Sequence, residues 1–499
     1  MMSGSLLYSD IAIIPEPTSL KAVAGCFVFN GSTPLVADEA SMTAALAFAD
    51  AVRPALGRQP HISGIVADGV ASIVFRLDTA LVDCGSEGYC LDVTSQGVEI
   101  VSPSQAGLFY GVQTLRQLLP AVFFANKPLA EKEWSIPCVS IFDKPRYQWR
   151  GLMLDTGHDF QCLSNIFRFI DLMALHKFNV FHWHISDLGT FPLEIDGYPE
   201  LQNPAHLGKR LRGNPPRPVK QGFYTQAEAR AVVEYAAARY IKVVPEIDVP
   251  GHSQPVLLAY PEFDCPTPMY QWQDFERWEY CLANPKAMAF IEEVLQQILA
   301  IFPSEYVHIG GDECPATHWE GCPVCQAKVA KLKLDGVEGL RKHFLAHVET
   351  FLNSRGRRMI GWDDIFQSGV KKESAVMIWR PDLELAVPAA TAGHNLVMAP
   401  HSHLYFDYSE ARTPLDKVYS YEPHPEGLAE EMSDLVLGAQ GQLWSDNHPT
   451  TAEIDRLLYP RSCALAEVVW SAKEQRNWES FSRRLQRHGE RLAKLGIVW

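Results

Sequence analysis

The sequence has few positively charged residues relative to its negatively charged ones. Lysine and arginine total 44 against 59 aspartates and glutamates, which gives a net charge of −15 and an estimated pI of 5.6. An acidic surface of this kind argues against nucleic acids and anionic membranes as partners. No apolar run approaches membrane-spanning length, and residues 1–17 lack a basic start followed by an apolar core. We therefore expect a cytoplasmic protein, unless a leader has been removed.

A disulfide framework is also missing. The eleven cysteines are an odd number and are scattered, so we expect mostly reduced thiols. Cys314, Cys322 and Cys325 lie close together in "CPATHWEGCPVC", but a zinc knuckle needs a fourth ligand, and none stands at the usual spacing. The sequence therefore predicts no metal site and no cofactor.

The length of 499 residues is enough for two or three domains. Residues 89–103 alternate apolar and polar side chains around a turn, as a hairpin does, and residues 107–120 follow with helical periodicity. These features predict a small α/β domain. Pro145 and a change of pattern place its boundary, which divides the chain into residues 1–145 and 146–499.

Beyond this boundary, short apolar segments alternate with long amphipathic ones. Eight segments are candidate strands: residues 149–155, 179–185, 242–248, 306–312, 358–364, 375–380, 395–400 and 437–444. Eight strands, each followed by a helix or a long loop, predict a (β/α)8 TIM barrel. Doubly wound sheets alternate in the same way, but no glycine-rich phosphate loop follows any of these strands.

Polar and aromatic residues gather at the carboxyl ends of the predicted strands, where barrel enzymes carry their chemistry. They are Asp155, His182, His184, Asp187, Asp248, His252, Asp312, Glu313, Trp362, Asp363, Trp379, Tyr405, Asp407, Trp444 and Asp446, with Arg150 entering the first strand. Tryptophan faces stack on sugar rings and carboxylates bind hydroxyls, so this rim suits a small glycan. The alternatives are tryptophans that merely fill the core, and an Arg150 that pairs with Asp155.

The segment "HIGGDE", residues 308–313, resembles the H-x-G-G-D-E motif of glycoside hydrolase family 20, the β-N-acetylhexosaminidases. Further segments resemble the family in the family's order: "PRYQWRGLMLD", "FHWHISD", "EIDVPGHS", "GWDDI", "YFDY", "GQLWSD" and "YPRSCALAEVVW". The first domain also resembles the small α/β domain that precedes the family's barrel. The resemblance implies exo-acting hydrolysis of terminal non-reducing GlcNAc or GalNAc residues, with retention, through an oxazolinium intermediate that the substrate's own acetamido group forms.

The two adjacent acids, Asp312 and Glu313, cannot both point at one hydroxyl, because neighbouring side chains on a strand point in opposite directions. The resemblance implies a separate role for each. Glu313 would protonate the leaving oxygen and later activate water. Asp312 would orient the acetamido group and stabilise positive charge on its nitrogen, while Tyr405 would hydrogen-bond the acetamido oxygen. Asp187, His252 and Glu313 would form a relay that sets the pKa of the acid.

The remaining implied contacts concern the sugar ring. Arg150 would hold the O3 and O4 hydroxyls, Asp407 the O6 side, and Asp446 the O4 hydroxyl. Trp362, Trp379 and Trp444 would enclose the acetamido methyl and the ring and exclude water.

Three departures put the sugar preference in doubt. Asp446 stands where the family usually has a glutamate, so its reach is one methylene shorter. The first predicted strand is followed by Thr156, Gly157 and His158, where the family usually has an arginine and a histidine. The family's Asp-Asp-Gln is replaced by Asp187 and then a leucine and a glycine.

Two other classes of function compete with a glycosidase. A metal-dependent hydrolase barrel is one, because His182 and His184 are two residues apart and so share a strand face. A catalytically silent sugar-binding protein is the other, although an intact Asp312, Glu313 and Tyr405 speak against it. No feature of the sequence indicates an oligomeric state.

Overall fold

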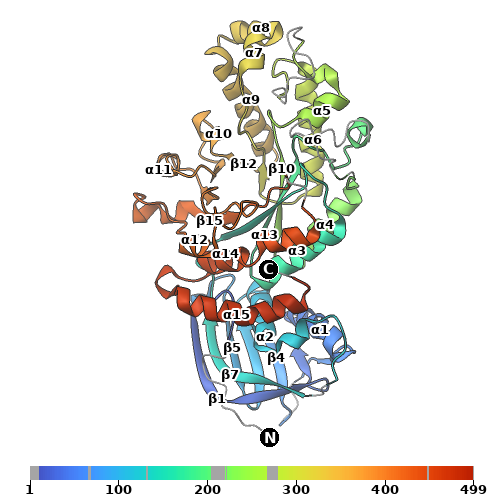
Figure 1. Cartoon of the computed structure of the whole chain (residues 1–499), viewed down its shortest axis with the longest axis vertical. Helices are drawn as coiled ribbons and strands as arrows, with labels where there is room; N and C mark the ends of the chain where they lie inside the picture. Colours follow the sequence, from blue (N-terminus) through green and yellow to red (C-terminus); the bar gives the residue numbers. More distant parts are fainter. Residues whose placement is uncertain are drawn as a thin grey trace.

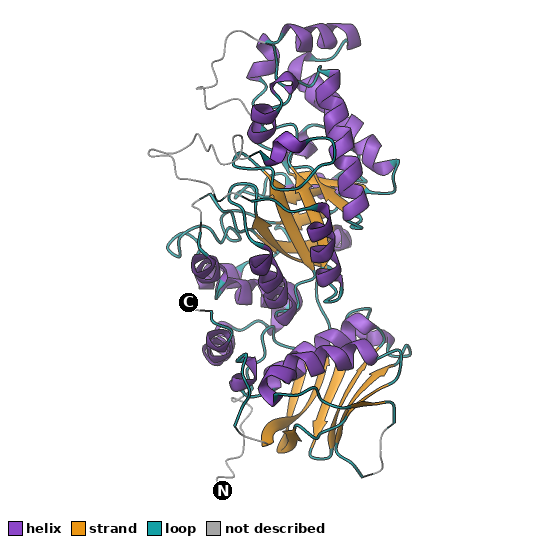
Figure 2. Cartoon of the chain, turned by 90° about the vertical axis from the view of Figure 1, so that its right-hand side faces the viewer, coloured by secondary structure: helices purple, strands orange, loops and turns teal. Residues whose placement is uncertain are grey.

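The computed structural model describes residues 11–65, 69–130, 133–203, 220, 222–266, 279–446 and 449–497. It consists of a mixed sheet with helices on one face and a closed barrel stacked above it along the long axis of the molecule (Figure 1 and Figure 2). No helix in these ranges combines the length and the apolarity that crossing a bilayer requires.

The sheet has seven strands in the order β1-β7-β5-β6-β4-β2-β3. Their bounds are β1 Ser19–Asn30, β2 Leu35–Ala37, β3 Ile62–Ser63, β4 Ser72–Leu77, β5 Tyr89–Thr94, β6 Gly97–Ser102 and β7 Glu133–Asp143. Helices α1 (Met42–Leu56) and α2 (Gln105–Leu118) pack side by side on one face (Figure 2). The antiparallel β5–β6 pair and α2 match the predicted hairpin and helix.

The barrel consists of eight parallel strands and closes through the pairing of β15 with β8. The bounds are β8 Trp149–Asp155, β9 Val180–Ser186, β10 Lys242–Ile247, β11 Tyr306–His308, β12 Arg358–Trp362, β13 Ala375–Ile378, β14 Leu396–Met398 and β15 Val436–Gly441. Each strand falls within one residue of, or inside, a predicted segment. The predicted (β/α)8 barrel preceded by a smaller α/β domain is therefore confirmed.

Helices surround the barrel and extend beyond its carboxyl end. They are α3 Leu163–Leu175, α4 Gln226–Ala237, α5 Gln254–Ala259, α6 Pro285–Ile301, α7 Thr317–Gly321, α8 Pro323–Leu332, α9 Gly336–Asn353, α10 Asp364–Gln367, α11 Ala386–Thr391, α12 Leu415–Ser420, α13 Thr451–Leu458, α14 Arg461–Trp470 and α15 Trp478–Lys494. Several of these helices begin with an N-cap residue whose side chain accepts a hydrogen bond from a backbone N–H. Thr225 and Glu228 form a reciprocal capping box at α4, and Asn284 caps α6.

The last helix, α15, packs between the barrel and the sheet (Figure 1). Arg484 donates to the carbonyl of Ile13 at 2.9 Å, and Arg491 donates to the carbonyl of Ala12 at 2.7 Å. The end of the chain therefore contacts its beginning. The predicted division at residue 145 stays a prediction; strand β7 ends before it, and β8 begins after it.

Arg150 lies at this junction and not at the predicted sugar site. Its side chain is fully buried at the start of β8, and its guanidinium donates to both carboxylate oxygens of Glu87, at 2.7 and 3.0 Å. It also donates to the carbonyls of Tyr147 and Lys177, at 2.8 and 2.9 Å. The prediction that Arg150 holds a sugar is wrong, because a side chain near the beginning of a barrel strand lies at the amino-terminal end. The alternative pairing with Asp155 is wrong as well.

Replacing Arg150 with methionine should destabilise the protein by about 3–5 kcal/mol, because it leaves the Glu87 carboxylate without its cation. Glu87 keeps 22% of its side chain exposed, so the lower end of this range applies. Urea unfolding measures the loss, and the double variant Arg150→Met, Glu87→Met should recover part of it. An unchanged free energy of unfolding in the single variant would contradict this structural role.

Candidate active site

The two adjacent acids follow a turn that only glycines permit. Strand β11 ends at His308, and Gly310 and Gly311 then adopt φ values of +65° and +89°. A Cβ atom at Gly310 would overlap the carboxylate of Asp248, whose Oδ1 accepts the N–H of Gly311 at 3.2 Å. The glycines therefore let the chain pass directly over Asp248 and place Asp312 beside it.

Asp312 faces the interior of the rim. Its side chain is 14% exposed, and its Oδ1 is buried without a hydrogen-bond partner among the described residues. Burial and the nearby Asp248 carboxylate raise the pKa of Asp312 well above its ordinary value. Burial likewise raises the pKa of Asp248 to about 7. Two carboxyl groups this close do not both ionise readily, so the pair retains a proton near neutral pH.

Glu313 faces the open side of the rim, since its side chain is exposed. Its φ of 43° is unusual for a residue with a Cβ and costs about 1–2 kcal/mol. Such strain is found preferentially where function requires a particular side-chain direction. The two neighbouring acids therefore occupy different environments, one enclosed and one accessible.

Asp187 and His252 form a buried pair behind the acids. Asp187 accepts from His252 Nδ1 at 2.8 Å and from His184 Nε2 at 2.9 Å. Burial opposes ionisation of Asp187, but the surrounding imidazoles hold its pKa well below the ordinary value. His252 Nε2 lies 3.8 Å from Asp312 Oδ2. His252 therefore lies between Asp187 and Asp312, and the relay to Glu313 stays a prediction.

His158 is a rim residue to which the sequence analysis assigned no role. Its Nδ1 lies 2.9 Å from Asp155 and 3.2 Å from Asp187, and its Nε2 lies 3.4 Å from Asp446. Burial disfavours the imidazolium, but Asp187, Asp155 and Asp446 outweigh burial and raise the pKa of His158 to about 9. The available signal was its position, where the family usually has an arginine. This cation stands on the rim, unlike Arg150.

Asp407 and Asp446 form one side of the rim. Asp446 is 43% exposed, whereas Asp407 is half-buried and its Oδ1 has no hydrogen-bond partner in the described part of the chain. Burial, reinforced by the charge of Asp446, raises the pKa of Asp407 to about 7. Both carboxyl groups are positioned to accept hydroxyl hydrogens from a neutral ligand.

Aromatic rings form a wall of the same rim. Trp362 is 1% exposed and donates its indole N–H to Glu246 at 3.0 Å, and Trp379 donates to Asp364 at 3.1 Å. The Trp444 ring lies 5.9 Å from that of Trp362. Trp379 and Trp444 are only half-buried, so they are not simple core filler. Asp364, which the sequence prediction also missed, fixes the orientation of Trp379.

Tyr405 completes this wall. Its ring centroid lies 6.1 Å from that of Trp444. Burial and the charges of Asp312 and Asp407 raise the pKa of Tyr405 well above its ordinary value, so the hydroxyl keeps its proton and can donate it in a hydrogen bond. Asp312, Tyr405 and the three tryptophans are therefore brought together as predicted from the strand ends.

The floor beneath the site is a carboxylate surrounded by histidines. Glu246 pairs with His182 at 3.0 Å, with His308 at 2.9 Å and with His184. Atoms of His182, Glu246 and His308 are close enough to hold a metal ion. Glu246 accepts hydrogen bonds from His184 and from the indole of Trp362. His182 Nε2 and His308 Nε2 have no hydrogen-bond partner among the described residues.

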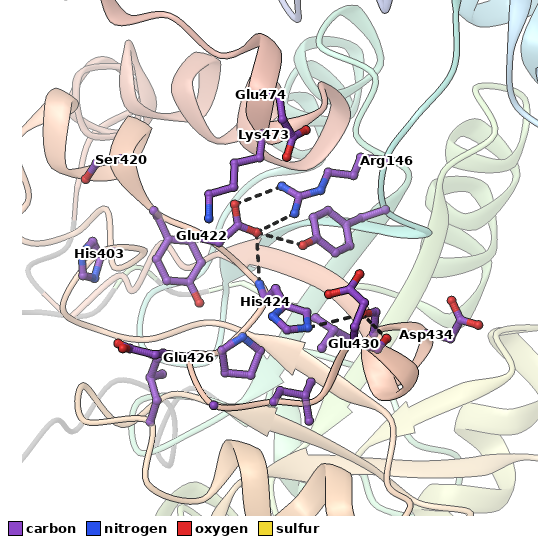
Figure 3. A pocket seen from close by; sticks show the side chains of 18 of the residues that line it. Arg146, His403, Ser420, Glu422, His424, Glu426, Glu430, Asp434, Lys473 and Glu474 are labelled. Atoms are coloured by element: carbon purple, nitrogen blue, oxygen red, sulfur yellow. Dashed lines mark hydrogen bonds and ion pairs between the residues drawn. The ribbon is translucent and has the colours of Figure 1, made fainter.

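A large cavity of about 860 Å³ lies elsewhere. Tyr147 and Gln148, which precede β8, and Val436, which begins β15, line it, so it lies toward the amino-terminal ends of the strands. Figure 3 shows its polar centre, where Glu422 accepts from Arg146 at 2.7 Å and from Tyr147 at 3.2 Å. None of the predicted site residues lines this cavity.

Comparisons with known proteins agree with this geometry. The model of glycosyl hydrolase family 20, catalytic domain, matches residues 147–473, and that of domain 2 of the same family matches residues 10–144. A beta-hexosaminidase of Porphyromonas gingivalis is 35% identical over 98% of this chain and 64% of its own length. A beta-N-acetylhexosaminidase of Cellulomonas fimi is 30% identical over 98% of this chain and 96% of its own length.

Solved structures of the family superpose on nearly the whole chain. The GH20 exo beta-N-acetylglucosaminidase of Vibrio harveyi, in complex with N-acetylglucosamine, has a TM-score of 0.88 and 28% identity over 99% of this chain and 79% of its own. The Streptomyces plicatus N-acetyl-beta-hexosaminidase has a TM-score of 0.83 and 28% identity over 97% and 95%. The motifs, the barrel and both family models agree, and the chain belongs to glycosyl hydrolase family 20.

Proposed function

We propose that this protein is an exo-acting β-N-acetylhexosaminidase that releases terminal non-reducing GlcNAc or GalNAc from small glycans. The names of its relatives and the N-acetylglucosamine bound to the Vibrio harveyi structure support this substrate class. The observation that carries the proposal is the environment of Asp312: an enclosed carboxyl, with one oxygen that has no partner among the described residues, beside Tyr405 and the tryptophan wall. That arrangement suits an acetamido group, which offers one N–H donor and one carbonyl acceptor.

In the proposed first step, the acetamido oxygen attacks the anomeric carbon as the glycosidic C–O bond breaks. Glu313 transfers its proton to the departing oxygen, which the open position of its side chain allows. With the proton of the acid pair on Asp248, the Asp312 carboxylate accepts the acetamido N–H and stabilises the positive charge that develops on that nitrogen, while Tyr405 donates to the acetamido oxygen. In the second step, Glu313 removes a proton from water, which opens the oxazolinium ring with overall retention.

The other rim residues are proposed to bind the ring hydroxyls. His158, in place of the wrongly predicted Arg150, supplies a positive charge near O3 and O4, Asp446 accepts a hydrogen bond from O4, and Asp407 faces the O6 side. Trp362, Trp379 and Trp444 exclude water from the intermediate. Family membership favours this reaction over a metal-dependent hydrolase, and the complete acid pair favours it over a silent sugar-binding protein. The cytoplasmic location stays a prediction.

Glu313→Gln should reduce kcat/KM by about 10²–10⁴-fold on substrates with poor leaving groups, because the amide cannot donate the proton that the leaving oxygen needs. The loss should be much smaller on aryl glycosides, whose leaving groups need little protonation. Steady-state kinetics on both kinds of substrate test the role. Equal losses on both would rule Glu313 out as the general acid.

Asp312→Asn should lower kcat by roughly 10²–10³-fold, because the developing charge on the acetamido nitrogen loses its carboxylate partner. A thiazoline analogue of the oxazoline should inhibit the unchanged enzyme competitively and bind the variant more weakly. Asp434→Asn, an exposed acid at the amino-terminal end of the barrel, is the matched control and should leave both values unchanged. Trapping a glycosyl ester on any carboxylate of the chain would refute the substrate-assisted mechanism.

If His158 contacts the sugar, the affinity for a neutral sugar should fall at alkaline pH. Its pKa of about 9 means that the imidazolium is present at neutral pH and is lost as the pH rises through about 9. A hydrogen bond to a charged group contributes about 1.5–3 kcal/mol, so the affinity for free GlcNAc should fall roughly tenfold or more across that range. Calorimetric titration of GlcNAc at several pH values measures this fall.

The variant His158→Arg is the control for this assignment. Arginine keeps its charge at all accessible pH values, so its GlcNAc affinity should stay flat through pH 9. An identical alkaline decline in the variant would assign the titration to another group and remove His158 from the proposed contact.

A further inference from the structure

Four cysteines from separate segments meet in the outlying part of the barrel domain. Cys265 follows the short helix η5 (Pro261–Phe263), Cys281 precedes α6, and Cys322 and Cys325 flank the first turn of α8. Their exposed fractions are 5% for Cys265 and 0% for the other three. Figure 1 shows α7 and α8 at the end of the molecule farthest from the N-terminal sheet. The cluster is therefore separate from both the catalytic rim and the large cavity.

The sulfur positions match a tetrahedron. Sγ–Sγ distances are 4.0 Å for Cys265–Cys325, 4.0 Å for Cys281–Cys322 and 3.6 Å for Cys281–Cys325. All four sulfurs lie within 4.8 Å of one another. A tetrahedral zinc ion with Zn–S bonds of about 2.3 Å requires sulfur separations of about 3.8 Å. A disulfide would require about 2.05 Å, so these pairs are not disulfides.

We propose that Cys265, Cys281, Cys322 and Cys325 bind one structural zinc ion. Four thiolates form a closed coordination shell that leaves no position for water or substrate, so the ion would stabilise the fold and take no part in hydrolysis. Cys322 and Cys325 are spaced as the C-x₂-C half of such sites. Cys314, which the sequence groups with these two, is not a ligand.

The surroundings of the four sulfurs suit a negatively charged metal centre. The backbone N–H of Cys325 points to Cys322 Sγ at 3.5 Å, a donor that stabilises a thiolate. The Lys328 ammonium is close enough to interact with the charges of Cys281 and Cys325, and it donates to the carbonyl of Leu282 at 2.8 Å. Four thiolates with a divalent cation carry two net negative charges, which this lysine partly compensates.

The proposed ion would tie together two connections, the one that follows β10 and the one that follows β11. Helix α7 links Asp312 and Glu313 to Cys322, while Cys265 and Cys281 belong to the connection between β10 and α6. The same two connections are joined by the Trp319 indole, which donates to the carbonyl of Tyr280 at 2.9 Å. Zinc would therefore hold the segment that begins at the catalytic acids.

Metal analysis of the purified full chain tests the proposal directly. Protein prepared without chelator should contain about one zinc ion per chain, and the double variant Cys322→Ser, Cys325→Ser should retain less than about 0.1. Cys84→Ser, a buried cysteine of the N-terminal sheet domain, and Cys314→Ser are matched controls that should keep the zinc. A metal-free wild-type protein that takes up no zinc, or a double variant that keeps its zinc, would overturn the proposal.

Cobalt substitution tests the same site without any variant, in case the serine variants do not fold. Cobalt exchanged into the wild-type chain should give thiolate-to-cobalt charge-transfer absorption and the d–d bands of a tetrahedral site. Removing the metal with a mercurial reagent and a chelator should lower the unfolding temperature, and adding zinc should restore it. Bound iron in place of zinc, disulfides among the four cysteines, or an octahedral cobalt spectrum would refute the assignment. These measurements do not depend on hydrolytic activity.

Discussion

A single buried carboxylate, that of Asp187, organises the catalytic end of the barrel. Three imidazoles from different segments contact it: His158 after β8, His184 on β9 and His252 after β10. An ionised carboxylate in the interior is costly unless it is paired, and each imidazolium is equally costly without an anion. Each group therefore maintains the charge of the others. Because the partners come from three barrel segments, this mutual dependence also fixes the relative positions of those segments.

This network separates the pKa values of neighbouring acids. Asp187 has its pKa lowered by the imidazoles that contact it, whereas Asp312 and Asp248 have their pKa values raised by burial and by nearby carboxylates. His252 lies between the two groups, bonded to Asp187 and facing Asp312. One site can contain both ionised and protonated acids when their environments shift the carboxyl pKa values in opposite directions. The adjacent Asp312 and Glu313 differ in burial as well, since Asp312 is enclosed and Glu313 is exposed, and this difference suits the separate tasks proposed for them.

The sequence predicted features that depend on local pattern and missed those that depend on spatial neighbours. All eight barrel strands were predicted, because short apolar runs are local signals. Arg150 was assigned to the sugar site because of its charge. Its position near the start of β8, however, places it at the amino-terminal end of the barrel. The cation that lies on the rim, His158, is paired with Asp155 at the end of β8, Asp187 just after β9 and Asp446 after β15, which no window of sequence brings together.

The cysteines show the same limit and also why the outlying region of the barrel needs a cross-link. Proximity in sequence grouped Cys314 with Cys322 and Cys325, whereas the fold supplies Cys265 and Cys281 from an earlier connection. The helices there are short: α5 has 6 residues, α7 has 5 and α8 has 10. Helices of this length are marginal alone and bury little apolar surface. A metal bound by four thiolates joins such segments without a large core, and it would do so next to the turn that carries the strained Glu313.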